Sequence, residues 1–263
     1  MKLQTSNIRN EFVGLKNQDW LDKQRIAGKV VANTLALLED LVKERTTKSL
    51  IELDNIAKEF IITNDCIPTF LNYKGFPNSV CISVNKQLVH GIPTNYKLQD
   101  GDVVSFDLGA TYMGAIGDAA ITCIYGEPKS KTHVKGIETA NKCLVNAISA
   151  ISIGKRIGVI GDAIYKTAHS NGFNIIEQYG GHGLSWNKPH DAPFIANKSN
   201  QNKGIRIQSG MTIAIEPLLI PANCLTTTKI GSDGWTVYTE DISYHAELSI
   251  FVHEDHVEIM TRH

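Results

Sequence analysis

The chain has 263 residues, of which 42% are hydrophobic and 20% are charged. Its 26 basic and 27 acidic residues leave a formal net charge of −1. The apolar fraction is too high and the net charge too small for a disordered chain, and the length is sufficient to bury a core. Because the basic excess of an electrostatic nucleic-acid binder is missing, no nucleic-acid partner is expected.

The sequence offers no feature that would direct the chain to a membrane or out of the cell. Its longest apolar stretches, such as 211–220, are shorter than the roughly 18 residues of a membrane-spanning helix, and the N-terminus lacks the apolar core of a signal peptide. Five cysteines, never in a CxxC pair, argue for reduced thiols and against a disulfide scaffold or a zinc knuckle. We therefore expect a cytoplasmic protein without a membrane partner.

Helical and strand patterns follow one another along the chain. Apolar residues recur at helical intervals over 19–42, and a second helix is expected over 50–60, capped by Thr46-Thr47. Short β-rich pieces follow, of which 79–84 is the clearest, and then a β-hairpin over 102–125. Further helices are expected over 135–151 and 157–170, the latter closed by Asn171-Gly172, and strands over 175–178, 211–219, 236–239, 242–253 and 257–260.

The order of elements is helices, strands, helices and strands again. This order predicts one α+β domain over 1–263, built from two related halves, with helices packed outside a curved antiparallel sheet. The N-terminal helices of 1–65 belong to that domain, and no linker long enough to divide the chain is present.

Four carboxylates stand in otherwise apolar strand segments: Asp107, Asp118, Glu216 and Glu247. If the hairpin turned symmetrically about 112–113, Asp107 and Asp118 would face each other with Cβ atoms about 4.5–5.5 Å apart. Carboxylates at that separation repel strongly in a low-dielectric site unless a cation or a shared proton lies between them. One such acid is usually exposed or salt-bridged, but four of them, with no Lys or Arg on the strands beside Asp107, Glu216 or Glu247, argue for a bound cation.

A histidine completes the pattern in the segment Tyr179-Gly180-Gly181-His182-Gly183, which we expect to form a turn open to close approach. A histidine in such a turn is more often structural, yet together with the four carboxylates His182 becomes the nitrogen donor of an oxygen-rich metal site. Four acids and one neutral imidazole carry four negative charges, which two divalent cations would balance. Mn, Fe, Co, Ni or Zn suit these donors, and such a metal pair is a common hydrolytic device.

The motifs around these residues resemble the single-domain bacterial methionine aminopeptidases of type I. The resemblance covers nearly the whole chain, and the order Asp, Asp, His, Glu, Glu is that family's ligand order. It implies the pita-bread fold with pseudo-twofold halves and removal of the initiator methionine from nascent proteins when the second residue is small. The matching motifs are 79–85 with His90-Gly91-Ile92-Pro93, 101–104 leading to Asp107, Gly117-Asp118, Gly181-His182-Gly183, 210–217 and Asp233-Gly234-Trp235-Thr236-Val237.

The resemblance also implies a role for each metal ligand. Asp107 would bind one metal through both oxygens, while Asp118 and Glu247 would bridge the two metals. His182 and Glu216 would complete the other metal, and Glu216 would also shuttle a proton from the bridging hydroxide that attacks the first peptide bond.

On the substrate side, the resemblance implies that His90 contacts the peptide near its terminal amine and that His190 stabilises the oxygen of the tetrahedral intermediate. The methionine side chain would pack against aromatic rings and a thiol, which suit a thioether. The same four residues also fit an ordinary hydrophobic core: Tyr73, Phe76, Cys81 and Trp235. The implied partners are the N-terminal methionine of nascent chains and, transiently, the ribosome, and the implied oligomeric state is a monomer.

Two stretches depart from the family pattern. Residues 183–189 are one longer than usual and lack the usual Gly and Arg, which affects the placement of His190. Around Glu247, His245 and Leu248 replace the usual neighbours. His245 lies two residues from Glu247, on the same strand face, and is hypothesised to reach the metal shell.

Two other functions fit the same residues. One is a related pita-bread peptidase that cleaves before proline, although 1–70 is too short for the extra N-terminal domain such enzymes carry. The other is a non-catalytic protein of this fold that binds peptides or ribosomes. Such proteins commonly lose metal ligands, whereas all five are present here.

Overall fold

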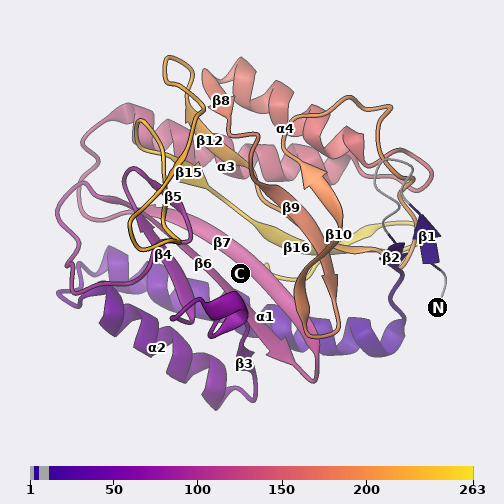
Figure 1. The fold of residues 1–263 in the computed structure, drawn as a ribbon, viewed down its shortest axis with the longest axis horizontal. Coiled ribbons are helices and arrows are strands. Elements are labelled where there is room, and N and C mark those ends of the chain that lie inside the picture. The colour runs from indigo at the N-terminus through magenta and orange to yellow at the C-terminus, as the bar shows by residue number, and fades with distance from the viewer. Residues whose placement is uncertain (1–2, 6–11, 263) are drawn as a thin grey trace.

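A computed structural model describes residues 3–5 and 12–262 of the chain. Two helices, α1 (Gln18–Lys43) and α2 (Leu50–Thr63), lie along one side of the molecule, and α3 (Lys131–Ala150) and α4 (Gly158–Ser170) lie along the other, with the strands between them (Figure 1). This arrangement confirms the predicted α+β class, with helices outside antiparallel strands. In the part of the chain that the structure describes, no helix is long and apolar enough to cross a bilayer.

Each half has its own apolar core. Leu35 of α1 and Leu53 of α2 pack with Phe106 in one buried cluster, whereas Leu144 and Ile164, from α3 and α4, belong to another. The strands that precede α3 in the chain are β1 (Leu3–Thr5), β2 (Phe12–Gly14), β3 (Ile67–Pro68), β4 (Val80–Val84), β5 (Gln87–Val89), β6 (Val103–Tyr112) and β7 (Ala115–Ile124). Those that follow α4 are β8 (Phe173–Ile175), β9 (Gly180–Ser185), β10 (Lys188–Ala196), β11 (Thr212–Ile215), β12 (Leu218–Pro221), β13 (Lys229–Ile230), β14 (Val237–Tyr238), β15 (Tyr244–His245), β16 (Leu248–Val252) and β17 (Val257–Ile259).

The second helix begins later than the expected cap. The N-cap is Ser49, whose hydroxyl accepts from the Glu52 N–H while the Glu52 carboxylate accepts from the Ser49 N–H at 2.7 Å. This reciprocal capping box satisfies two otherwise free donors, so the prediction of Thr46-Thr47 as the cap was wrong. The predicted stop of α4 at Asn171-Gly172 is confirmed, because Gly172 has the positive φ of 86° that a helix C-terminus favours.

The hairpin of β6 and β7 has a different register from the expected one. Asp107 pairs with Ala120, and Asp118 pairs with Gly109. The connection is a two-residue turn at Met113 and Gly114, both with positive φ, as a type I′ hairpin requires. Asp107 and Asp118 are therefore diagonal neighbours on one face of the ladder, not directly opposed residues.

The segment around His182 is a strand, β9, and not the expected turn. Strand β9 lies between β10 and β11, and both neighbours approach its glycines closely. A Cβ at Gly181 would lie 2.2 Å from the Ala214 carbonyl oxygen, and one at Gly183 would lie 2.0 Å from that of Ala192. Glycine flanks His182 because neighbouring backbones occupy the space that a side chain would need.

Strand β7 joins the two halves along 245–249. Ala120 and Glu247 exchange two backbone hydrogen bonds, of 2.9 and 3.2 Å. On one side of this bridge, the Ser249 hydroxyl bonds to the backbone of Asp118, and on the other the Thr122 hydroxyl bonds to the backbone of His245. These contacts bring carboxylates from both halves of the fold side by side along β7.

Candidate metal centre and substrate pocket

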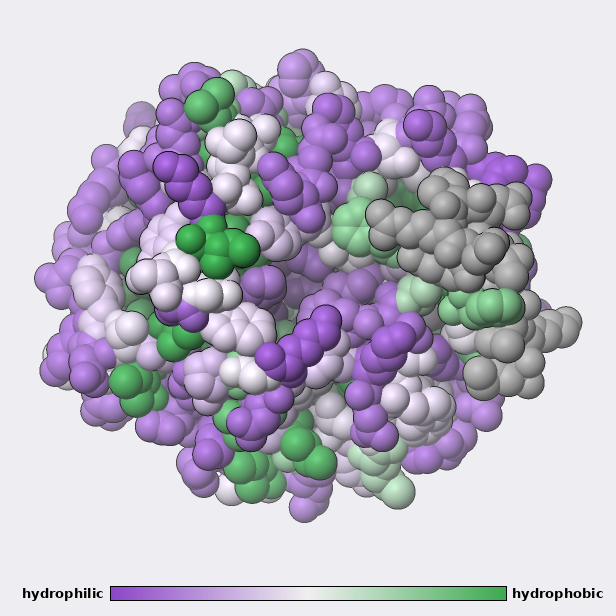
Figure 2. Space-filling model, in the orientation of Figure 1, coloured by the Kyte–Doolittle hydropathy of each residue, from purple (hydrophilic) through white to green (hydrophobic). Residues whose placement is uncertain are grey.

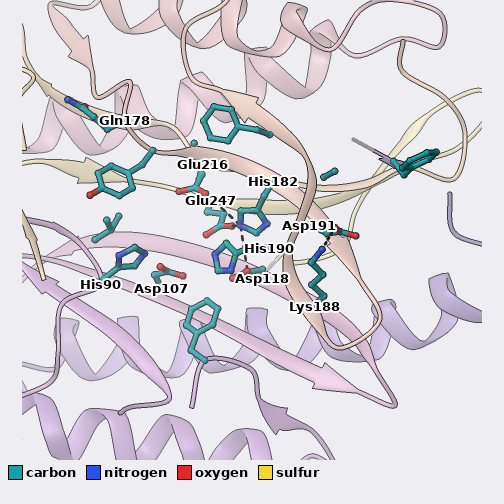
Figure 3. Close-up of a pocket in the computed structure, with 17 residues that line it drawn as sticks. His90, Asp107, Asp118, Gln178, His182, Lys188, His190, Asp191, Glu216 and Glu247 are labelled. Carbon is teal, nitrogen blue, oxygen red and sulfur yellow. Dashed lines mark hydrogen bonds and ion pairs between the residues drawn. The ribbon is translucent and has the colours of Figure 1, made fainter. Parts of the chain in front are cut away.

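The five predicted metal ligands come together in one cavity of about 620 Å³. Figure 2 shows the face seen in Figure 1, which is hollowed near its middle where hydrophilic side chains gather. Asp107 and Asp118 reach the cavity from the β6–β7 hairpin and His182 from β9, whereas Glu216 follows β11 and Glu247 precedes β16 (Figure 3). Both halves of the fold therefore contribute to the site.

His182 lies at the centre of three carboxylates. Its Nε2 is 3.7 Å from Glu216 Oε1, 3.8 Å from Glu247 Oε1 and 4.0 Å from Asp118 Oδ2. These distances exceed those of hydrogen bonds. They are shorter than about 4.2 Å, the greatest separation of two ligand atoms that each lie about 2.1 Å from one ion. The three distances from His182 therefore suit a shared cation, and ligand atoms of Asp118, His182 and Glu247 all lie within 4.8 Å of one another.

Several oxygens of this cluster are buried without a partner. Asp107 Oδ1, Asp118 Oδ1 and Glu247 Oε1 have no hydrogen-bond partner among the described residues. Buried polar atoms are nearly always paired, so such atoms require an explanation. Lys188, a cation on the cavity wall, is already paired with Asp191. The donor set thus fits divalent metal ions, which would satisfy oxygens that nothing else in the cavity reaches.

Electrostatics point the same way. Burial raises the pKa of Asp107 to about 7, and burial followed by repulsion from Asp107 raises that of Glu216 to about 8. The pKa values of Asp118 and Glu247 lie well above their ordinary values, for burial and then for the charges of the neighbouring carboxylates. Charges crowded in this way are costly unless protons or cations neutralise them.

His182 is oriented as a ligand. Its Nδ1 bonds to the carbonyl oxygen of Gly183 at 3.3 Å, so the ring proton belongs on Nδ1 and the Nε2 lone pair faces the carboxylates. Burial lowers the pKa of His182 to about 4, which keeps the imidazole neutral. A neutral imidazole with one nitrogen fixed by a carbonyl is the usual form of a metal-binding histidine.

A second cavity of about 280 Å³ opens beside the carboxylates. The predicted methionine-pocket residues Tyr73, Phe76, Cys81 and Trp235 all line it. They enclose space and do not simply fill a closed core. Burial, and then the charge of Asp107, raise the pKa of Cys81 well above its usual value, so this residue stays a thiol and contributes an apolar wall.

Trp235 owes its place to a tight turn. The Asp233 carboxylate accepts hydrogen bonds from the N–H groups of Trp235 and Thr236, both at 2.8 Å. Gly234, which lies between Asp233 and Trp235, adopts a φ of 77°. The Trp235 ring then meets Phe76 edge to face, with centroids 5.3 Å apart. This turn gives a physical reason for the Asp-Gly-Trp-Thr motif.

His90 and His190 lie where the two cavities meet, because both residues line both cavities. His190 stacks on Tyr73, with centroids 5.4 Å apart, and its ring centroid is 4.4 Å from that of His182. The extra residue in 183–189 is absorbed by the β9–β10 hairpin, and His190 still reaches the site. His90 directly follows β5 and packs edge to face against Tyr179.

Several residues that line the cavities had not been predicted from the sequence, and Phe70 and Tyr179 are two of them. Phe70 lines both cavities, and no spacing singled it out, because it lies in an irregular segment before the pocket. Tyr179 also lines the larger cavity, and its place beside the glycines was the one available signal. His245 is buried beside Glu216 and Glu247, as its spacing from Glu247 had suggested.

The chain belongs to metallopeptidase family M24, whose family model matches residues 22–254. It is similar to the methionine aminopeptidase of Mycoplasma capricolum, with 39% identity over 253 residues, covering 95% of this chain and 99% of that protein. Methionine aminopeptidase 1 of Bacillus subtilis is 36% identical over 240 residues, covering 90% of this chain and 94% of that protein. These likenesses confirm the resemblance that the motifs predicted.

Solved structures agree. The methionine aminopeptidase from Rickettsia prowazekii superposes with a TM-score of 0.89 at 31% identity, covering 95% of this chain and 99% of that one. A prolidase from Pyrococcus furiosus superposes with a TM-score of 0.73 at 17% identity, and only 65% of that chain is covered. The second likeness concerns the fold alone, and together the two confirm the predicted pita-bread architecture.

Proposed function

We propose that this protein is a metal-dependent aminopeptidase that removes the initiator methionine from nascent proteins and prefers a small second residue. One observation carries the proposal: a carboxylate–histidine centre shares the walls His90, Asp107 and His190 with an apolar pocket of about 280 Å³. A peptide whose first side chain enters this pocket presents its terminal amine and first amide to the centre. The full-length likeness to methionine aminopeptidases supports methionine as that side chain.

The proposed metal centre consists of two divalent ions held by Asp107, Asp118, His182, Glu216 and Glu247. Bound metal ions supply Lewis acidity and lower the pKa of water, which is the chemistry that amide hydrolysis needs. The side chain of Glu216 is 13% exposed, compared with 3% for that of Glu247. Glu216 therefore faces the substrate space, and its raised pKa suits it to take a proton from the attacking water and pass it to the leaving amine.

The two histidines at the junction of the cavities act on the substrate. His190, stacked on Tyr73, donates a hydrogen bond to the scissile carbonyl oxygen as negative charge develops there. His90, held after β5, contacts the first amide beside the terminal amine. Tyr73, Phe76, Cys81 and Trp235 exclude water and hold the thioether, which packs well against aromatic edges.

The two other functions are less well supported. Likeness to prolidases is limited to the fold, and no feature of the pocket calls for proline in the second position. A non-catalytic role would leave the buried, unpartnered oxygens of Asp107, Asp118 and Glu247 without a purpose.

A peptide assay separates the three functions. The metal-free protein is supplied with Mn²⁺ or Co²⁺ and offered Met-Ala-Ser and a matched peptide that carries proline at the second position. We expect methionine release from Met-Ala-Ser that depends on the added metal. Preference for the proline peptide would favour the prolidase-like enzyme, and absence of turnover with every metal would favour the binding protein.

We further propose that residues 1–263 act as one catalytic domain, as a monomer in the cytoplasm, close to the ribosome where nascent chains emerge. Five free cysteines, four of them buried, suit a reducing compartment. Size-exclusion chromatography and co-sedimentation with ribosomes test the monomer and the ribosome contact separately.

A further inference from the structure

His245 is a buried histidine with no evident structural task. It is 2% exposed, and neither ring nitrogen has a hydrogen-bond partner among the described residues. A buried polar group left in this state costs stability. Binding of an ion by the imidazole explains its free nitrogens better than packing alone does.

The backbone around His245 is fixed. Its N–H donates to the Thr122 hydroxyl at 3.1 Å, and the same hydroxyl donates to the His245 carbonyl oxygen at 2.6 Å. Strand β15 also pairs His245 with Leu218, two residues beyond Glu216. Thr122 lies on β7, which also carries Asp118, and Leu218 lies two residues from Glu216, so these contacts hold His245 beside the carboxylates.

The position of the ring relative to these carboxylates is informative. His245 Nε2 lies 3.8 Å from Glu216 Oε2 and 3.9 Å from Glu247 Oε2. His182 Nε2 approaches the same two residues at 3.7 and 3.8 Å, through their Oε1 atoms. The two imidazoles therefore lie near the same pair of carboxylates but face different oxygens. The nitrogen–oxygen distances are too long for hydrogen bonds and short enough for both atoms to bind one ion.

We propose that His245 is a second nitrogen ligand of the metal centre and binds on the Oε2 side of Glu216 and Glu247. This inference rests on the proposed function, because it presupposes that the carboxylates hold metal ions. The centre then has two imidazoles for two ions, which favours borderline divalent ions such as Co²⁺, Fe²⁺ or Zn²⁺ over Mn²⁺.

The test is cobalt binding, measured without any substrate. Metal-free wild type and the variants His245→Gln, His182→Gln and His133→Gln are titrated with Co²⁺ by calorimetry. X-ray absorption at the cobalt edge counts the imidazoles in the loaded proteins. His133 is the matched control, because it lies beside His245 in the fold and its Nδ1 already has a partner, the hydroxyl of Tyr244, whereas neither ring nitrogen of His245 has one among the described residues.

We expect two imidazoles per two cobalt ions in wild type and in His133→Gln, but one in His245→Gln and one in His182→Gln. Cobalt affinity should fall at least about tenfold in both of the latter variants. One imidazole in wild type, or affinity and imidazole count unchanged in His245→Gln while His182→Gln loses both, would overturn the assignment of His245 and leave the five-ligand centre standing. Unchanged binding in both variants would instead overturn the proposed centre itself.

Should His245→Gln fail to fold, the wild-type imidazole count decides alone. Melting of the metal-free variants shows whether a change in affinity reflects unfolding. A purely structural histidine would alter that melting temperature without changing the cobalt spectrum.

Discussion

The Ser249 hydroxyl and the Asp118 backbone exchange two hydrogen bonds where the halves of the molecule meet. The hydroxyl accepts from the Asp118 N–H at 3.0 Å and donates to the Asp118 carbonyl oxygen at 2.6 Å. Ser249 is fully buried, so water cannot replace it. A single side chain of one half thereby positions a carboxylate of the other half inside the proposed metal centre.

Replacing this hydroxyl should affect both stability and metal binding. We expect Ser249→Ala to lower the free energy of unfolding by about 1–3 kcal/mol, because two buried backbone groups lose their partner. Urea denaturation of the metal-free protein measures the loss, and metal titration should show weaker binding. Ser249→Thr keeps the hydroxyl and serves as the control. An Ala variant as stable as wild type would show that Asp118 does not depend on Ser249.

The crowded carboxylates make the stability of the metal-free protein depend on pH. The folded pKa values of Asp107 and Glu216, about 7 and about 8, lie above those of unfolded chains, which are about 4. Groups with a raised folded pKa contribute fully below the unfolded value and lose that contribution as pH rises through the folded value. Stability should therefore fall between about pH 4 and pH 8.

Unfolding by urea in the presence of a chelator, at pH 5.5 and pH 8.5, measures this dependence. The double variant Asp107→Asn with Glu216→Gln should show a flatter profile, since it removes two of the titrating groups. Stability that rises with pH over this window in wild type would contradict the account of a cation site built from mutually repelling carboxylates.

The turn that holds Trp235 offers a test of the substrate pocket. Asp233→Ala removes the acceptor for the Trp235 and Thr236 N–H groups and should loosen the indole wall. We expect KM for a methionine peptide to rise between about tenfold and a hundredfold, because misplaced positioning groups cost about that much. Asp233→Asn, which keeps an oxygen acceptor, should lose less. Cobalt affinity should not change in either variant, and a loss of metal instead of substrate affinity would contradict the assignment.

A substitution can test whether the close approach of neighbouring strands requires glycine beside His182. Gly183→Ala would place a Cβ 2.0 Å from the carbonyl oxygen of Ala192, so β9 and β10 must separate. We expect a loss of about 1–3 kcal/mol in the free energy of unfolding and weaker metal binding, since His182 moves with its strand. Ser185→Ala, on the same strand, is the control and should leave metal binding unchanged. A well-folded Gly183→Ala variant with full metal affinity would contradict this explanation of the glycines.

Much of the fold and site follows from local patterns. The helices were predictable because their apolar periodicity is strong, and the acids because Asp107 interrupts an otherwise apolar strand and Glu216 directly follows another. Strand β9 was not predictable, because glycines that allow close backbone approach are also typical of a turn. The register of the β6–β7 hairpin depends on a positive φ at Met113, and no pattern of side chains predicts that backbone conformation.

Contacts between segments that are distant in the sequence could not be predicted either. His245 could be placed near Glu247 from their spacing, but its approach to Glu216 depends on the pairing of β12 with β15. Phe70 reaches the pocket through the irregular chain between β3 and η1 (Tyr73–Gly75), where no period applies. Long-range packing of this kind decides which residues share a cavity and cannot be derived from one chain's local composition.

The most direct test of the central claim is an anomalous difference map from crystals of the protein loaded with Co²⁺. We predict two peaks in the large cavity, surrounded by Asp107, Asp118, His182, Glu216 and Glu247. A map with no peak there, or with cobalt only at the surface cluster of His253, His256 and Glu258, would contradict the claim that these five side chains form a metal centre.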